Sequence, residues 1–270
     1  MGGGRASGTL VSRLPLLPGH LGPVAARSFR LARRFVNSLR AGYAVRHFRD
    51  LRSSVRIMIA APEEQVRPLV AELAPLFDWR RKTVLLCSAG AGSGALERLR
   101  ARGAATGSLE IAPGGGRLVA EGDRTALIWA RQLARQLDLP LDEVAPHKLG
   151  VYRAGVSFAS SLVAPLMDSA TACLCEAGVS RNVAMKMMEA SILDALRGYL
   201  YSGRKSWRGP VADGDRAKVL HELEALVASD PSMAKHYRWA SLLALERMGR
   251  HPDLVRFLAE FSPGGRRAIA

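Results

Sequence analysis

The feature that most constrains the fold is a long apolar run at residues 148–175, KLGVYRAGVSFASSLVAPLMDSATACLC. Its apolar side chains recur at helical spacing, which predicts one continuous helix with a face that packs against other elements. A second stripe is polar and includes Arg153, Ser157 and Ser161, as expected of a helix that lines a cleft. The alternative is a core helix whose serines bond to their own backbone. Its uncharged run, residues 154–167, is too short to span a bilayer, so we expect no membrane association.

Strand-like and helix-like segments alternate before this helix, and only helical segments follow it. Apolar runs predict strands at residues 12–17, 43–48, 55–60, 83–87, 104–109 and 117–121. Helical patterns lie between them, the first at residues 23–39, and start and stop signals predict later helices at residues 180–201, 215–227, 230–249 and 252–261. Such alternation is typical of a parallel sheet covered on both faces.

The predicted organisation is therefore an α/β domain at residues 1–147, with a loose start at 1–11, and an all-α helical domain at residues 148–262. Residues 263–270 form a tail. The helix at residues 180–201 is apolar around more than one face, so more than one neighbour must cover it. We therefore expect a homodimer through the helical domain.

The net charge of +15 is concentrated at the N-terminus, where ten arginines and one aspartate precede residue 54. Three explanations compete: an organelle transit peptide, a nucleic-acid surface, and the phosphate-facing end of a nucleotide fold. Arginine, alanine, glycine and leucine dominate throughout while lysine is scarce, which favours the third. Nucleic acid is the least favoured partner, because most of these arginines fall within predicted strands and helices.

Cysteine and histidine usage limits the remaining classes. The three cysteines, Cys87, Cys173 and Cys175, form no disulfide framework, so we expect a cytoplasmic protein. The six histidines include no HExxH pattern, and we expect no metal site.

A glycine turn and two strand ends point to an anion site. The turn GHLG at residues 19–22 precedes the predicted helix at 23–39, where free backbone N–H groups would face a phosphate. It matches the dinucleotide fingerprint GxGxxG incompletely, because Leu17 would replace the first glycine. A simple strand-to-helix turn is the alternative. Ligands of such sheets lie beyond the carboxyl ends of the strands. The candidate cofactor-binding residues are Gly19, Leu21, Gly22, Arg46, Ala61, Pro62 and Ser88.

Four stretches together resemble a two-domain family that joins a Rossmann-like NAD(P)-binding domain to a helical domain of unknown function. These stretches are IMIAAPEEQV, VLLCSAGAGSGALERLRARGAATGSLE, YRAGVSFASS and GPVADGDRAKVLHELEAL. The family is related to pyrroline-carboxylate reductases, ketopantoate reductases and hydroxyacid dehydrogenases. The resemblance implies a parallel Rossmann-like sheet and a C-terminal domain like that of 6-phosphogluconate dehydrogenase. It also implies NADP or NAD as cofactor.

The chain departs from the family where chemistry is expected. Glu110 and Arg153 stand where the family has histidines, and Ser161 where it has asparagine. An arginine cannot give up a proton at neutral pH, so the catalytic residues stay unassigned. The candidate substrate cleft consists of Glu110, Arg153, Ser157 and Ser161, with Arg153 holding the carboxylate of a small anionic ligand.

Three functions remain open. The first is an NAD(P)-linked oxidoreductase acting on a small acid or imine, in which Arg46 and Arg49 after the second strand would suit the 2′-phosphate of NADP. The alternative for both is an ordinary solvated surface arginine. The second function is a non-catalytic dimeric relative that binds a ligand or partner. The third is a basic nucleic-acid binder.

Overall fold

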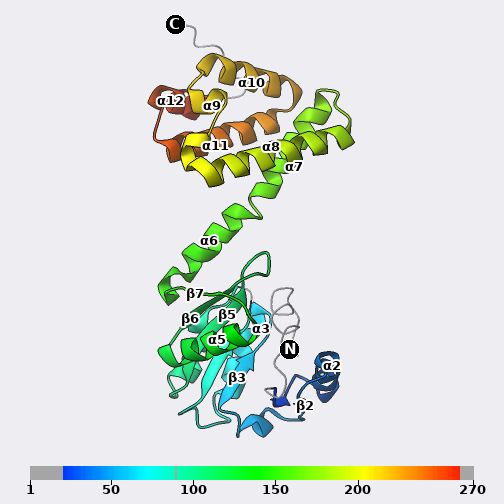
Figure 1. Cartoon of the computed structure of the whole chain (residues 1–270), viewed down its shortest axis with the longest axis vertical. Coiled ribbons are helices and arrows are strands. Elements are labelled where there is room, and N and C mark those ends of the chain that lie inside the picture. The colour runs from blue at the N-terminus through cyan, green and yellow to red at the C-terminus, as the bar shows by residue number, and fades with distance from the viewer. Residues whose placement is uncertain (1–20, 89, 262–270) are drawn as a thin grey trace. The chain divides into compact units, whose positions relative to one another are not determined.

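The computed structural model describes residues 21–88 and 90–261, which form two compact units, one ending at Val156 and one beginning at Ser157 (Figure 1). The sequence placed the boundary nine residues earlier, at 147/148. The first turns of α6 (Leu149–Ala159) belong to the first unit because Leu149 is buried there and Arg153 bonds to its loops. Each unit has its own hydrophobic core.

The first unit is built on a five-stranded sheet in the order β3-β4-β5-β6-β7. Its strands are β3 (Arg56–Ile59), β4 (Thr83–Leu86), β5 (Ala105–Ile111), β6 (Leu118–Gly122) and β7 (Leu141–Glu143). Only the β5–β6 pair is antiparallel, because a short Pro-Gly-Gly-Gly turn joins these strands directly. The sheet is therefore predominantly parallel rather than wholly so.

Helices cover both faces of this sheet. On one face, α5 (Arg124–Gln136) packs Trp129 and Leu133 against a cluster that includes Leu85. On the other, α3 (Glu63–Leu73) and α4 (Glu97–Arg100) cover a cluster that includes Val84 and Leu86. Successive side chains of a strand point to opposite faces, so the apolar run of β4 supplies both cores.

The start of the described chain differs from the prediction. Residues 23–39 are not one helix, because β1 (Pro23–Val24) pairs in parallel with β2 (Tyr43–Ala44) in a separate two-stranded sheet. Helix α2 (Phe29–Leu39) begins only after Ser28, whose Oγ accepts a hydrogen bond from the Leu31 N–H at 3.3 Å. The predicted strand at 43–48 is correspondingly short and leads into the 3₁₀ turn η2 (Phe48–Leu51). The strand predicted at 12–17 lies outside the described residues.

The second unit is all-helical over residues 157–261, as predicted. Asp215 and Asp230 cap their helices with carboxylate oxygens, and Gly249 ends one in the left-handed region at φ 66°. Its core includes Val219, Leu223 and Leu245. The helices are α7 (Val163–Glu176), α8 (Arg181–Ser202), α9 (Pro210–Asp213), α10 (Arg216–Ser229), α11 (Pro231–Met248) and α12 (Pro252–Glu260).

The long helix predicted at residues 148–175 is interrupted. A turn at residues 160–162 separates α6 from α7. Pro165 accounts for the break, because proline has no N–H and its ring clashes with the carbonyl four residues earlier, that of Ser161. By length and composition alone, the helical stretch Pro146–Glu176 could still cross a membrane, with a mean hydropathy of 1.4.

Candidate functional site

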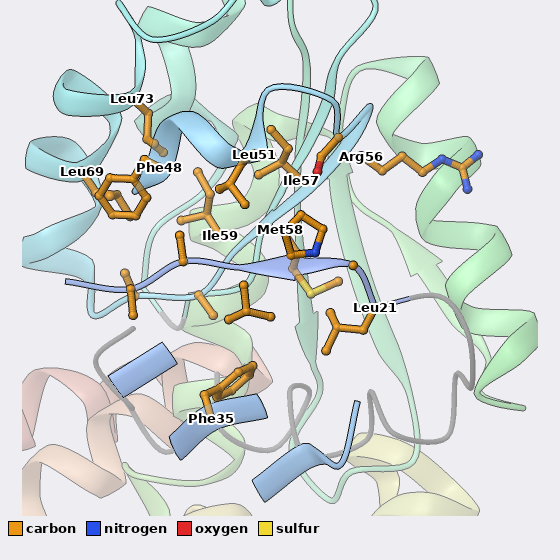
Figure 2. Close-up of a pocket in the computed structure, with 18 of the residues that line it drawn as sticks. Leu21, Phe35, Phe48, Leu51, Arg56, Ile57, Met58, Ile59, Leu69 and Leu73 are labelled. Carbon is orange, nitrogen blue, oxygen red and sulfur yellow. The ribbon is translucent and has the colours of Figure 1, made fainter. Parts of the chain in front are cut away.

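An elongated pocket of about 480 Å³ lies along β3 in the first unit. Figure 2 shows β1 running between Phe35 of α2 and the side chains of β3 that line the pocket, among them Met58 and Ile59. The pocket reaches the carboxyl ends of β1 and β3, where Arg27 and Ala61 line it. The pocket also extends to the amino end of β3, where Ser54 and Arg56 line it. Open parallel sheets bind ligands at the carboxyl ends of their strands, so that part of the pocket is the candidate site, and the volume suits a small molecule.

The turn that follows β1 is made by Ala25, Ala26, Arg27 and Ser28, and α2 begins after it. A GxGxxG fingerprint starts directly after the first strand, so its three glycine positions are Ala25, Arg27 and Arg30. Gly22 lies before β1, where its carbonyl accepts the Tyr43 N–H at 3.3 Å, so placing it in a strand-to-helix turn was wrong. Gly19 lies outside the described residues. Ser28, with its capping oxygen, is the sequence signal that would have given the correct start of the helix.

The other predicted cofactor residues are distributed around this edge of the sheet. Leu21, Gly22 and Ala61 line the pocket. Pro62 caps α3, and the exposed Arg46 lies over the Phe29 ring at 4.5 Å, neither of them lining it. Ser88 follows β4, and its Oγ is buried without a hydrogen-bond partner among the described residues. A buried hydroxyl without a partner marks a place where a ligand atom or water is needed.

Two of the predicted cleft residues pair with each other. The Arg153 guanidinium donates from Nη2 to the Glu110 carboxylate at 2.9 Å and to the Ala91 carbonyl at 3.1 Å. It also donates from Nη1 to the Gly90 carbonyl. The side chains of Arg153 and Glu110 are only 26% and 17% exposed. The Glu110 carboxylate therefore pairs with Arg153, and the role predicted for Arg153 with a ligand carboxylate stays a prediction.

A buried carboxylate holds the same loop from the other side. Glu121 of β6 is 1% exposed and accepts hydrogen bonds from the Ser93 N–H (2.6 Å), the Ser93 hydroxyl (2.7 Å) and the Ser108 hydroxyl (2.6 Å). A Cβ on Gly92 would lie 2.7 Å from Cδ2 of Leu149, so a larger residue would require this buried side chain to shift. Glu121 was not among the predicted site residues, although a glutamate inside the apolar strand LVAEG indicates a buried carboxylate that needs hydrogen-bond donors.

The remaining cleft candidates have local roles. Ser161 donates to the Ser157 carbonyl at 3.4 Å, so this serine bonds to its own backbone. Both residues belong to the second unit. In the first unit, Tyr152 is partly buried, and its pKa is raised by burial and by the Glu110 and Asp142 carboxylates. Tyr152 is a proton-bearing group beside Arg153 that the sequence analysis did not select. Over residues 21–88 and 90–261, no cluster of histidine, cysteine or carboxylate side chains could hold a metal ion.

Comparisons agree with this architecture. Residues 117–243 match the model of a domain of unknown function, DUF2520. No curated protein matches the chain. A Bacteroides fragilis protein described as an NADP oxidoreductase is similar in structure, with a TM-score of 0.70 at 12% identity over 91% of this chain and 96% of that one.

Two reductase structures are also similar. An imine reductase from Myxococcus stipitatus in complex with NADP⁺ gives a TM-score of 0.62 at 17% identity, over 95% of this chain and 98% of that one. A pyrroline-5-carboxylate reductase from Coxiella burnetii gives 0.55 at 14% identity, over 94% and 96%. The predicted fold is thereby confirmed: the chain has a Rossmann-like α/β domain followed by an all-helical domain, the fold of these NAD(P) reductases.

Proposed function

We propose that this chain binds an NAD(P) nucleotide, with NADP favoured, at the carboxyl ends of β1, β3 and β4. The observation that carries the proposal is the pocket along β3, which has the volume of a ligand site and reaches the edge where such sheets bind nucleotides. The unpartnered Ser88 hydroxyl at the next strand end supports it. The imine reductases of the same fold, in complexes with NADP⁺ and with NAD⁺, also support it.

The residues of the β1–α2 turn fit a phosphate in an altered way. Cβ atoms at Ala25 and Arg27 limit the close approach of backbone N–H groups that glycines would allow. The Arg27 guanidinium can supply a charge-assisted hydrogen bond in their place, because this residue lines the pocket. Arg46, two residues after β2, would suit the 2′-phosphate that distinguishes NADP from NAD.

The reaction that fits this fold is oxidoreduction of a small acid or imine, with the nicotinamide supplying the hydride. In this chain Tyr152 is the group that would hold a proton, since a tyrosine phenol is protonated at neutral pH and burial beside the Glu110 and Asp142 carboxylates raises its pKa further. Arg153 would position the Gly90–Ala91 carbonyls rather than hold a substrate carboxylate.

The second candidate is a ligand-binding relative without catalysis. The Arg153–Glu110 ion pair favours it, because both positions where the family has histidines are here committed to each other. We further propose that the protein is a cytoplasmic homodimer. Three free cysteines support a reducing compartment, and the uncovered apolar side chains of α8 support a second copy as its cover.

A titration tests the nucleotide and a turnover assay separates the two candidates. Binding of NADPH and of NADH is measured by fluorescence, with Ser88→Ala and, as a control, the exposed Ser53→Ala. We expect NADPH to bind more tightly than NADH, Ser88→Ala to weaken binding by up to about tenfold through one lost hydrogen bond, and Ser53→Ala to leave it unchanged. Absence of binding at millimolar nucleotide contradicts the proposal. Loss of NADPH absorbance with a cyclic imine identifies a reductase, whereas binding without turnover identifies the non-catalytic relative.

A further inference from the structure

The outward side of α2 carries Arg30, Arg33 and Arg34, which all lie exposed. Positions three and four residues apart share one face of a helix, so the three guanidinium groups form a single surface, here termed the α2 arginine face. The opposite side of the helix carries Ala32 and Leu39, which are buried.

The segment that carries the α2 arginine face contains almost no negative charge. Residues 21–62 include nine arginines and one acid, Asp50, a net charge of +8. All nine arginines are exposed. None forms an ion pair within the part of the chain that the structure describes. Asp50 is occupied at the His47 N–H, 3.0 Å away. An uncompensated surface of this kind attracts polyanions.

The packing of α2 decides between two polyanions. A helix that binds a membrane surface must insert its apolar side. The apolar side of α2 is already used, since Leu39 and Phe35 belong to the first hydrophobic core. An arginine surface without an insertable face suits the phosphate backbone of a nucleic acid, which needs guanidinium groups alone.

We propose that the α2 arginine face binds the phosphate backbone of nucleic acid without reading its base sequence. Nucleic acid was the least favoured partner in the sequence analysis, because most of these arginines fall within secondary-structure elements. The arginines of α2 remain exposed although they belong to a helix, so their place in a secondary-structure element does not prevent binding. The surface is separate from the nucleotide pocket, which α2 lines with Phe35 from its inner side (Figure 2).

The test measures the affinity for labelled single-stranded and double-stranded oligonucleotides of mixed sequence by fluorescence anisotropy. The salt concentration is varied from about 50 to about 200 mM. The test variant is R30Q/R33Q/R34Q, which keeps helix propensity. The matched control is R80Q/R98Q/R102Q, which removes the same charge from exposed arginines elsewhere in the same unit. Thermal melting establishes that both variants are folded.

For wild type we expect binding to duplex that weakens by about 40-fold or more across this salt range, since each phosphate contact adds about 0.9 to the logarithmic slope. The test variant should lower that slope by about 2.7. The control should stay within about twofold of wild-type affinity, because these arginines are not part of the α2 arginine face and supply none of its proposed phosphate contacts. Equal losses in both variants, no binding at low salt, or binding to anionic vesicles instead of oligonucleotides would each overturn the proposal.

Discussion

Arg153 of α6 and Glu110 of β5 form an ion pair, with Nη2 and Oε2 2.9 Å apart. The same guanidinium also donates hydrogen bonds to the carbonyls of Gly90 and Ala91. The helix at this point is thus fastened to the loop after β4. Arginine donors that are partly buried hold a neighbouring backbone more firmly than exposed pairs do.

Replacement of Arg153 by alanine should therefore destabilise the first unit. We expect a loss of about 1.5–3 kcal/mol in the free energy of unfolding, because hydrogen bonds to a charged group are removed and the Glu110 carboxylate keeps no cation. Chemical denaturation measures it. In a double-mutant cycle, the loss of stability in Arg153→Ala/Glu110→Gln should be smaller than the sum of the losses in the two single variants. The exposed Arg124→Ala serves as control, and a stability equal to wild type in Arg153→Ala would contradict a structural role.

The β1–α2 turn gives a prediction on nucleotide affinity. Ala25→Gly should strengthen NADPH binding, since a glycine lets backbone N–H groups approach a pyrophosphate. One added charge-assisted bond corresponds to roughly tenfold to a hundredfold in affinity. Arg27→Ala should weaken binding if the guanidinium holds phosphate, and calorimetry gives both values. Stronger binding in Arg27→Ala would instead identify this side chain as an obstruction.

Local signals predicted much of the fold because they act within a few residues. The apolar runs at β3 and β4 gave buried parallel strands, and Asp215, Asp230 and Gly249 marked helix ends through their own hydrogen bonds or φ. The break before α7 was also local, and Pro165 predicts it once its clash with the preceding turn is considered.

The site was harder to predict because its contacts are distant in sequence. Arg153 lies 43 residues from Glu110 and 62 from Ala91, and no spacing rule links them. Gly22 suggested a phosphate turn directly before a helix, whereas it lies before β1. The real turn has no glycine, so only the position of β1 reveals it.

Cysteine reactivity tests the packing of the sheet. Burial raises the pKa of the Cys87 thiol to about 12. A thiolate is the reactive form, so Cys87 should resist a thiol reagent at pH near 8 while the partly exposed Cys175 reacts. Cys173, also partly exposed, should react more slowly than Cys175, because burial raises the pKa of its thiol as well. Mass spectrometry of the labelled peptides measures this. Cys87→Ala should leave the count of labelled thiols in the native protein unchanged and lower it by one after unfolding.

The buried Cys87 thiol should also make the free energy of unfolding decrease at high pH. Its folded pKa is above the unfolded value, so the folded state retains a proton that the unfolded state has lost. The stabilisation is fully present below about pH 9 and is lost as pH rises towards 12. In Cys87→Ala this part of the pH dependence should disappear, and a decline identical to wild type would assign it to other groups.

The last prediction concerns α8, a helix of 22 residues with Ala184 as its one buried residue. Leu193, Leu196 and Leu200 lie 41%, 50% and 76% exposed on one stripe, a large apolar surface for a single chain to leave in water. The charged Lys186 and Asp194 on the same helix make a bilayer a poor cover, so a second copy is the expected one.

Light scattering should give a dimer at micromolar concentration. Leu196→Glu combined with Leu200→Glu should give a folded monomer, because two carboxylates at the centre of an apolar interface cost several kcal/mol, about 2–5 for each charge left unpaired. Ala217→Glu, exposed on α10, adds a charge elsewhere and should leave the dimer intact. A wild-type monomer at these concentrations, or wild type that partitions into lipid vesicles through its apolar helices, would rule out the second copy as the cover of α8.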